Sequence, residues 1–142
     1  MNEILKLLKK AKKEGKNVYI CGNGGSASTA NHFANDLVKL CGIKAISLCA
    51  NQAIVMAYAN DNGYENIFVD QLKVFYEEGD VLITISGSGT SKNIVKAQKF
   101  VNGKGDNFIA FPTMNELHCN MGKIEDRHLI IVHKIATKLC QN

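Results

Sequence analysis

Two apolar runs, each followed by a glycine- and serine-rich loop, most constrain the fold of this chain. NVYICG at 17–22 leads into GNGGSAS at 22–28, and DVLITIS at 80–86 leads into SGSGTS at 86–91. Apolar runs of this length are typical of strands that are buried on both faces of a sheet. A helix-like segment follows each loop, and a strand–helix–strand unit places its two strands in parallel. The sequence therefore predicts an α/β protein with a parallel sheet.

The rest of the chain continues this alternation. Helices are predicted at 2–14, 26–40, 52–59, 66–76, 91–101 and 124–139, and two further strands at 44–49 and 107–111. Residues 112–123 contain Pro, Asn and Gly without a clear period and are predicted to form a loop. We expect a single domain over residues 1–142, with a doubly wound, flavodoxin-like sheet of about four to five parallel strands and helices on both faces.

Charge and cysteine content argue against several classes of protein. The formal net charge is +4, and many lysines lie in KLLKKAKKEGK near the N-terminus, where Ile4, Leu8 and Ala11 predict an amphipathic helix with a solvated lysine face. Aromatic and basic residues are not interleaved, so nucleic acid is not an expected partner. No apolar run approaches the roughly 20 residues of a membrane span, and no membrane association is expected. Five cysteines without a C-x-x-C pair or a signal peptide predict reduced thiols in the cytoplasm.

The two glycine- and serine-rich loops are candidate phosphate sites. Ligands of parallel sheets bind at the carboxyl ends of the strands, which is where both loops lie. Glycines let backbone N–H groups approach an anion, and Ser86, Ser88, Thr90 and Ser91 offer four hydroxyls. Either loop alone is more often a structural turn, but the pair favours phosphate binding. Neither loop has the Gly-Lys pair of a Walker motif, so a sugar monophosphate is a better candidate ligand than a nucleoside triphosphate.

Two predicted helices carry polar residues at helical spacing. His32 and Asp36 lie four residues apart, so they share one face of the helix after the first loop. Glu125 and His133 lie on one drifting stripe of the last helix, with His128 turned to the side. Two histidines and two carboxylates could form a divalent-metal site of the zinc type or a proton-transfer site. The alternative is two solvated helix faces that never meet.

The stretch NDNGYENIFVDQL at 60–72 offers further polar candidates. Asn60, Asp61 and Gly63 are expected to form a turn, Glu65 to lie in the first turn of the next helix, and Gln71 to point out of an apolar segment. Capping and surface polarity explain these residues most simply. A buried Glu or Gln that reaches a substrate is the alternative.

Four stretches together resemble the sugar isomerase (SIS) domain family and, within it, the phosphoheptose isomerases. They are CGNGGSASTANHFANDL (21–37), ANDNGYENIFVDQL (59–72), EEGDVLITISGSGTSKNIVKA (77–97) and IEDRHLIIVH (124–133). The resemblance implies an aldose–ketose isomerase of the bacterial heptose pathway, which interconverts sedoheptulose 7-phosphate and D-glycero-D-manno-heptose 7-phosphate through an enediol. It also implies a homo-oligomer, tetramer or dimer, with sites at subunit interfaces.

The resemblance assigns roles to particular residues. It implies that the substrate is bound by Asn23, Gly24, Ser26, Asn60, Asp61, Ser86, Ser88, Ser91 and Glu125. It implies one zinc ion per subunit on His32, Asp36, Glu125 and His133. His133 would be the catalytic acid, and Asp36 or Glu125 the base. The metal and acid–base roles compete for the same side chains.

The chain departs from the family at two site positions and in length. Asp36 stands where well-studied members have Glu, and Glu125 stands where they have Gln. Asp is shorter by about 1.5 Å, so its carboxylate is expected to fall short unless the backbone shifts. Relative to the family, the chain is expected to lack part of the N-terminal helical region and a segment around 111–115. Two alternatives therefore stay open, a non-catalytic SIS module that binds a sugar phosphate or a protein, and an isomerase of another phosphosugar.

Overall fold

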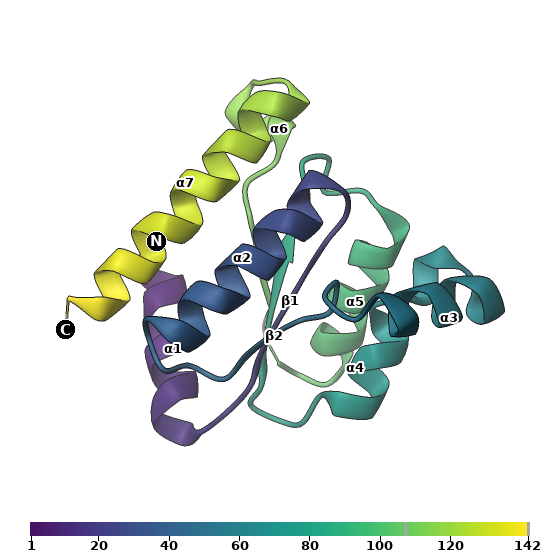
Figure 1. Ribbon diagram of the computed structural model, residues 1–142, viewed down its shortest axis with the longest axis horizontal. Helices are drawn as coiled ribbons and strands as arrows, with labels where there is room; N and C mark the ends of the chain where they lie inside the picture. The colour runs from purple at the N-terminus through teal and green to yellow at the C-terminus, as the bar shows by residue number, and fades with distance from the viewer. Residues whose placement is uncertain (107, 142) are drawn as a thin grey trace.

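A parallel sheet forms the centre of the computed structural model, which describes residues 1–106 and 108–141 (Figure 1). Within this part of the chain the sheet has four strands in the order β2-β1-β3-β4. They are β1 (Val18–Gly22), β2 (Ala45–Ser47), β3 (Val81–Ile85) and β4 (Phe108–Ala110). The predicted parallel α/β fold is confirmed. Asn107, the first residue of the predicted strand at 107–111, lies outside the described residues.

The register of the two central strands explains why the two loops meet. β1 pairs in parallel with β3 from Val18 opposite Val81 to Gly22 opposite Ile85. Both strands therefore end at the same level of the sheet. Since each loop begins directly after its strand, the two loops lie side by side at the carboxyl edge, where ligands of such sheets bind.

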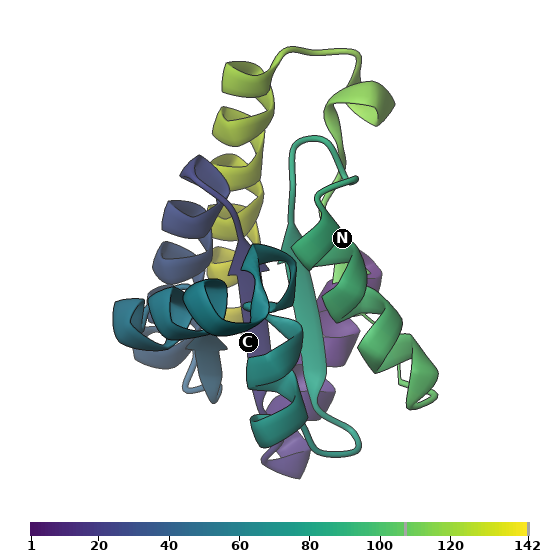
Figure 2. The ribbon, with the colours of Figure 1, turned by 90° about the vertical axis from the view of Figure 1, so that its right-hand side faces the viewer.

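Helices cover both faces of the sheet: Figure 1 shows the sheet edge-on between two helical layers, and Figure 2 looks onto one of these layers. One face is covered by α1 (Asn2–Glu14), α2 (Gly25–Lys39) and α7 (Met121–Cys140). The other face is covered by α4 (Val69–Phe75) and α5 (Lys92–Gly103), with α3 (Gln52–Asn62) and the 3-10 helix η1 (Tyr64–Asn66) at its side. The short helix α6 (Met114–Leu117) precedes α7.

Alternation along β1 and β3 divides the core into two clusters. Val18 and Ile20 face the cluster that includes α2 and α7, while Tyr19 and Cys21 face the cluster that includes α4 and α5. All five residues of each of these strands are buried, so apolar side chains are required on both faces. This explains the uninterrupted apolar runs in the sequence.

The N-terminal helix has the amphipathic character that its spacing predicts. Ile4, Leu8 and Ala11 are buried against the sheet layer, and the lysines of α1 are exposed. The helix ends at Gly15, which has a left-handed φ of 67°. No helix in the described part of the chain is both long and apolar enough to cross a membrane.

The helix α3 extends beyond its predicted end. It continues to Asn62 and stops only at Gly63, where φ is 87°. Asn60 and Asp61 therefore lie in the last helical turn, and the turn predicted for them is wrong. The helix begins after Asn51, whose side chain accepts a hydrogen bond from the N–H of Ile54.

Two other predictions about local structure are also corrected. The helix predicted at 66–76 is interrupted, with η1 at its start and α4 beginning only at Val69. The loop predicted at 112–123 contains α6, and α7 begins at Met121. A capping box explains α6, because the Thr113 side chain and the Glu116 side chain each bond the backbone of the other residue.

Candidate functional site

The two loops enclose a pocket of about 220 Å³ at the carboxyl edge of the sheet. The first loop contributes Asn23, Gly24, Gly25 and Ser26, and the second contributes Ser86, Gly87, Ser88 and Ser91. Met121 and Glu125 of α7 close the third side. We call this the cradle. The predicted meeting of the two loops is thus observed within one chain.

Helix α7 lies directly against both loops, and two glycines in the loops leave room for its side chains. A Cβ atom on Gly25 would collide with the carboxylate of Glu125. A Cβ atom on Gly87 would lie 2.6 Å from the sulfur of Met121 and 3.1 Å from Cγ2 of Ile124. A side chain at either position would therefore force the Glu125 carboxylate or the Met121 and Ile124 side chains to shift, so glycine gives α7 its close approach to the cradle.

The serine hydroxyls organise the second loop. Oγ of Ser86 accepts a hydrogen bond from the N–H of Gly89 at 3.0 Å, and Oγ of Ser88 accepts one from the N–H of Thr90 at 3.2 Å. Ser91 is the N-cap residue of α5, but its side chain forms no capping hydrogen bond within the described chain. Since each hydroxyl also has a proton to donate, these side chains can still donate to an anion in the cradle.

A pair of asparagines ties the first loop to α5. Nδ2 of Asn93 donates to Oδ1 of Asn23 at 2.8 Å, and Nδ2 of Asn23 donates back to Oδ1 of Asn93 at 3.0 Å. The Tyr64 hydroxyl also donates to Oδ1 of Asn23, at 2.9 Å. Sequence reasoning missed Asn93, which is only 2% exposed. The Asn23 side chain therefore holds the cradle together, in addition to any contact with a ligand.

A second set of polar side chains lies where α2 and α7 run side by side (Figure 1). Nε2 of His32 lies 2.8 Å from Nε2 of His133 and 3.3 Å from Oδ2 of Asp36. We call these three residues the His–Asp cluster. The alternative, in which the two polar faces never meet, is excluded. The Asp36 carboxylate thus contacts His32 within the cluster.

The His–Asp cluster is buried on its Asp36 side and exposed on its His32 side. Asp36 is 8% exposed, and Phe33 and Val132 beside it are buried in the core. The side chain of His32, in contrast, is 43% exposed. The two imidazole rings meet edge to face, with centroids 5.0 Å apart. One side of the cluster is therefore fixed by packing, and the other is accessible to a ligand.

The donor set of the cluster is suited to a metal ion. One ligand atom from each of the three residues lies within 4.8 Å of the other two. Two imidazole nitrogens that face each other at hydrogen-bond distance need a shared proton or a cation between them. Two histidines and one carboxylate are also a donor set that zinc sites use, with a further position left for water or substrate.

Glu125 does not join this cluster. It lies at the cradle, eight residues before His133 on the same helix, and this separation corresponds to about 12 Å along the axis. The four residues that were expected to bind one ion therefore lie at two separate places within this chain. Three gather between α2 and α7, and Glu125 faces the two loops.

The candidates at 60–72 lie away from the cradle. Asn60 donates a hydrogen bond to Asp61 at 2.7 Å on the exposed end of α3. Asp61 lines a separate pocket of about 260 Å³ that also includes Gln71. Gln71 is 4% exposed, and its amide donates to the backbone oxygens of Leu48 and Ile67. Gln71 is therefore a structural residue that binds backbone.

His128 contributes a contact that spacing did not indicate. It is fully buried, and its Nε2 lies 2.7 Å from the carbonyl oxygen of Pro112. Because a carbonyl can only accept, Nε2 carries the proton. Its Nδ1 has no hydrogen-bond partner in the described structure. The ring packs against Phe111, so His128 fixes α7 relative to the segment after β4.

Known proteins share this sequence pattern and this fold. The model of the SIS domain matches residues 1–112. The chain belongs to the SIS domain family.

Proteins with similar sequences include phosphoheptose isomerases. One from Thermodesulfovibrio yellowstonii is 39% identical over 116 residues, which cover 78% of this chain and 58% of that protein. One from Clostridium acetobutylicum is 33% identical, and the match covers 96% of this chain and 79% of that protein. Phosphoheptose isomerase 2 of Campylobacter jejuni is 38% identical, with 89% and 72% covered. The match to the first of these relatives thus spans 58% of the length of that protein.

Solved structures show the same arrangement over nearly the whole chain. A phosphoheptose isomerase from Neisseria gonorrhoeae superimposes with a TM-score of 0.89 at 25% identity, covering 99% of this chain and 85% of that one. One from Francisella tularensis gives 0.87 at 26% identity, covering 99% and 84%. This likeness includes α7, which lies beyond the residues that the SIS model matches.

Proposed function

We propose that this chain is a phosphoheptose isomerase, which interconverts sedoheptulose 7-phosphate and D-glycero-D-manno-heptose 7-phosphate in bacterial heptose biosynthesis. One observation carries the proposal: α2 and α7 each touch both the cradle and the His–Asp cluster. A phosphate site and a proton-transfer site are thereby held in a fixed relation. The sequence relatives with this name support the choice of substrate.

The separation of the two sites suits a long phosphosugar. Gly25 and His32 lie seven residues apart on α2, which corresponds to about 10 Å. An extended seven-carbon chain with a terminal phosphate spans about 10 Å, given single bonds of about 1.5 Å. A phosphate in the cradle therefore brings the carbonyl end of such a sugar near His32, Asp36 and His133.

Binding at the cradle depends on backbone and hydroxyl donors. The first turn of α2 and the first turn of α5 both begin at the cradle, so their N-terminal dipoles favour an anion. The hydroxyls of Ser26, Ser86, Ser88 and Ser91 donate to the phosphate oxygens. Glu125 cannot donate when ionised, so we assign it to hydroxyl groups of the sugar instead of to the phosphate.

Proton transfer is assigned to the His–Asp cluster. The carboxylate of Asp36 removes a proton from the carbon next to the carbonyl, and Nε2 of His133 protonates the carbonyl oxygen. The protonated Asp36 then delivers its proton to the neighbouring carbon, and Nε2 of His133 recovers a proton from the hydroxyl group that becomes the new carbonyl, which completes the aldose–ketose exchange. We prefer Asp36 over Glu125 as the base because Asp36 lies beside His133, whereas Glu125 is about 12 Å away along α7.

We also propose that His32, Asp36 and His133 can hold one Zn²⁺ ion. A bound ion would supply Lewis-acid polarisation of the substrate carbonyl. The three side chains would then act as ligands, and Asp36 would have only its second oxygen left for a proton. The acid–base and metal assignments are therefore separable by experiment.

The decisive experiment is an assay of purified protein with sedoheptulose 7-phosphate. We expect turnover that falls at least tenfold after dialysis against a chelator and returns with Zn²⁺ if the cluster holds the ion. Turnover that is insensitive to chelator would support the acid–base assignment alone. Tight binding of the phosphosugar without turnover would support the non-catalytic module, and turnover of a different phosphosugar only would correct the substrate.

The complete site is proposed to form between subunits of a homo-oligomer, a dimer or tetramer. The open face of the cluster and the exposed Leu129 and Ile130 on α7 support this. Asn60 and Asp61 lie away from the cradle of their own chain, so we assign them to the site of a neighbouring subunit. We place this assembly in the cytoplasm, and residues 1–142 are proposed to form one SIS domain.

Mixing two inactive variants tests the shared site. Asp61→Asn and His133→Ala are each expected to be inactive alone, whereas dissociated and reassembled mixtures should recover about a quarter of wild-type activity by random pairing. Recovery requires that the two residues act on one site from different chains. If the mixture stays inactive, or if a monomer in solution turns over substrate, the shared site is wrong.

A further inference from the structure

Two thiols face each other where α2 and α7 end. Cys41 lies two residues beyond α2, and Cys140 is the last residue of α7. Their Sγ atoms are 3.2 Å apart, although 99 positions separate them in sequence. Cys140 also lies 3.3 Å from the backbone oxygen of Leu40, and Cys41 lies 3.7 Å from that of Ala136. Both sulfurs are thus held in place by the opposite segment.

The geometry points to a disulfide. We propose that an anionic low-molecular-weight disulfide oxidises Cys41 and Cys140 to an intramolecular disulfide, which fastens the C-terminal end of α7 to the segment after α2. An S–S bond of about 2.05 Å requires the sulfurs to approach by about 1.2 Å. Cys140 is exposed in the last helical turn, where the backbone can adjust most easily.

The two thiols differ in access, which orders the reaction. Cys140 is exposed, whereas Cys41 is 5% exposed, so an external reagent meets Cys140 first. The pKa of the Cys41 thiol is raised to about 12, mainly by burial and in smaller part by the hydrogen bond with Cys140. This second effect disappears once the Cys140 sulfur is part of a mixed disulfide. Capture of Cys140 therefore favours ionisation of Cys41 for the second step.

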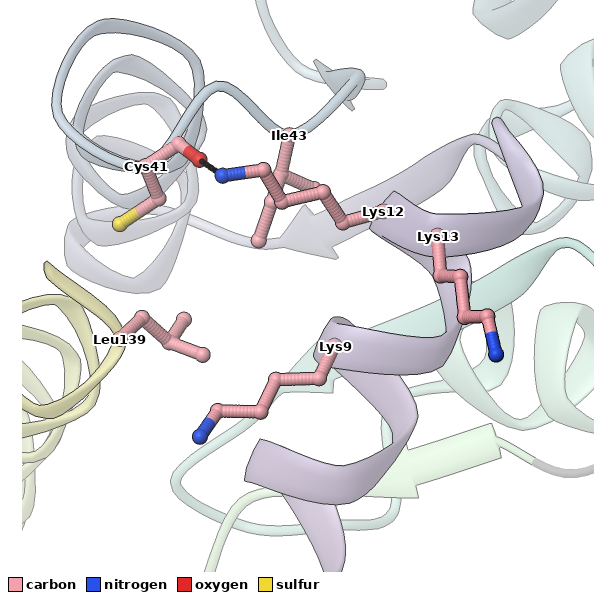
Figure 3. Close-up of a pocket in the computed structure, with 6 residues that line it drawn as sticks. All are labelled: Lys9, Lys12, Lys13, Cys41, Ile43 and Leu139. Carbon is pink, nitrogen blue, oxygen red and sulfur yellow. Dashed lines mark hydrogen bonds between the residues drawn. The ribbon is translucent and has the colours of Figure 1, made fainter. Parts of the chain in front are cut away.

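A basic pocket of about 490 Å³ adjoins Cys41 and favours an anionic reagent (Figure 3). It is lined by Lys9, Lys12, Lys13, Cys41, Ile43 and Leu139. The ammonium group of Lys12 donates to the Cys41 carbonyl oxygen at 2.6 Å. Figure 3 shows Lys9 extending toward Leu139, while Lys13 points away from Cys41. Positive charge on this side raises the local concentration of an anion beside the thiol pair.

The reaction proceeds by two exchanges that balance. The Cys140 thiolate attacks the reagent disulfide, which forms a mixed disulfide and releases one reagent thiolate. The Cys41 thiolate then attacks the Cys140 sulfur of the mixed disulfide and releases the second. Two protein thiols are oxidised, one reagent disulfide is reduced to two thiols, and the two protons pass to those products. Under reducing conditions the pair remains as two thiols.

The cross-link would act on the two helices that carry the His–Asp cluster. Asp36 lies five residues before Cys41, and His133 lies seven residues before Cys140. Closing so long a loop restricts the unfolded chain, and we expect the oxidised protein to melt about 5–10 °C higher than the reduced protein. The proposal does not depend on the catalytic assignment.

The test uses the full chain and oxidised glutathione. We expect an intact mass about 2 Da lower than that of the reduced protein, and a cross-linked peptide pair that contains Cys41 and Cys140. Cys41→Ser should stop at a stable glutathione adduct on Cys140. Cys119→Ser, which removes a thiol outside the pair, should form the cross-link normally.

The basic pocket is tested by the charge of the reagent. A Lys9→Gln/Lys12→Gln variant should react about fivefold more slowly with oxidised glutathione, but at an unchanged rate with uncharged bis(2-hydroxyethyl) disulfide. Equal slowing with both reagents would overturn the role of the lysines. A wild-type product that remains a glutathione adduct, or that consists of Cys140-linked dimers, would overturn the intramolecular disulfide.

Discussion

His133→Ala is expected to lower kcat for sedoheptulose 7-phosphate isomerisation by about 10²–10⁴-fold, the usual contribution of a positioned acid or base. KM should change less, because the proposed phosphate site, the cradle, lies about 12 Å along α7 from this side chain. The measurement is a steady-state assay with both sugar phosphates.

A matched control separates this effect from a general effect of removing a histidine. His118 is exposed, has a φ of 47° and lies outside both sites, so His118→Asn keeps a residue that tolerates this backbone conformation. The control should retain kcat within about twofold. A kcat for His133→Ala close to that of the control would remove His133 from the proposed mechanism.

Phe33→Ala is expected to destabilise the fold by about 3–5 kcal/mol. The ring is fully buried beneath the His–Asp cluster, and its centroid lies 6.2 Å from that of Phe111. A typical domain has only about 5–15 kcal/mol of stability, so this loss is large. Urea denaturation followed by circular dichroism measures the change in the free energy of unfolding.

Phe75→Ala provides the comparison on the opposite face of the molecule. Phe75 is 45% exposed, and we expect its truncation to cost no more than about 1 kcal/mol. A loss below about 1.5 kcal/mol at Phe33 would mean that α2 is not anchored as the structure indicates.

The sheet could be predicted because its signals are strong and local. Val18–Gly22 and Val81–Ile85 are buried on both faces, which requires the continuous apolar runs seen in the sequence. The end of α3 was placed too early because only Gly63 stops it, and polar residues such as Asn60 do not. The capping box of α6 was readable from Thr113 and Glu116, but its four-residue helix is too short for a periodicity.

The site was predictable only where helical spacing determines geometry. Their spacing of four residues alone places His32 and Asp36 on the same face of α2. Their approach to His133 depends instead on how α2 and α7 pack together, and these helices are far apart in the sequence. Glu125 and His133 lie eight residues apart, about 12 Å along the helix axis, so whether both reach one ion depends on the directions of their side chains and not on their spacing alone. The Asn23–Asn93 pair spans 70 positions and has no local signal.

Under the proposed function, the stretch of α2 from Gly25 to His32 sets the distance between the phosphate and the carbonyl end of the substrate. Its length is set by backbone hydrogen bonding, and one more turn would add about 5.4 Å, or about four carbon atoms of sugar. Under this proposal, the helix itself cannot adapt the site to a substrate that is one carbon longer or shorter. A site for a substrate one carbon longer or shorter would have to differ in the side chains near the two ends of this stretch. Asp36, one methylene shorter than the Glu expected there, is a difference of that size.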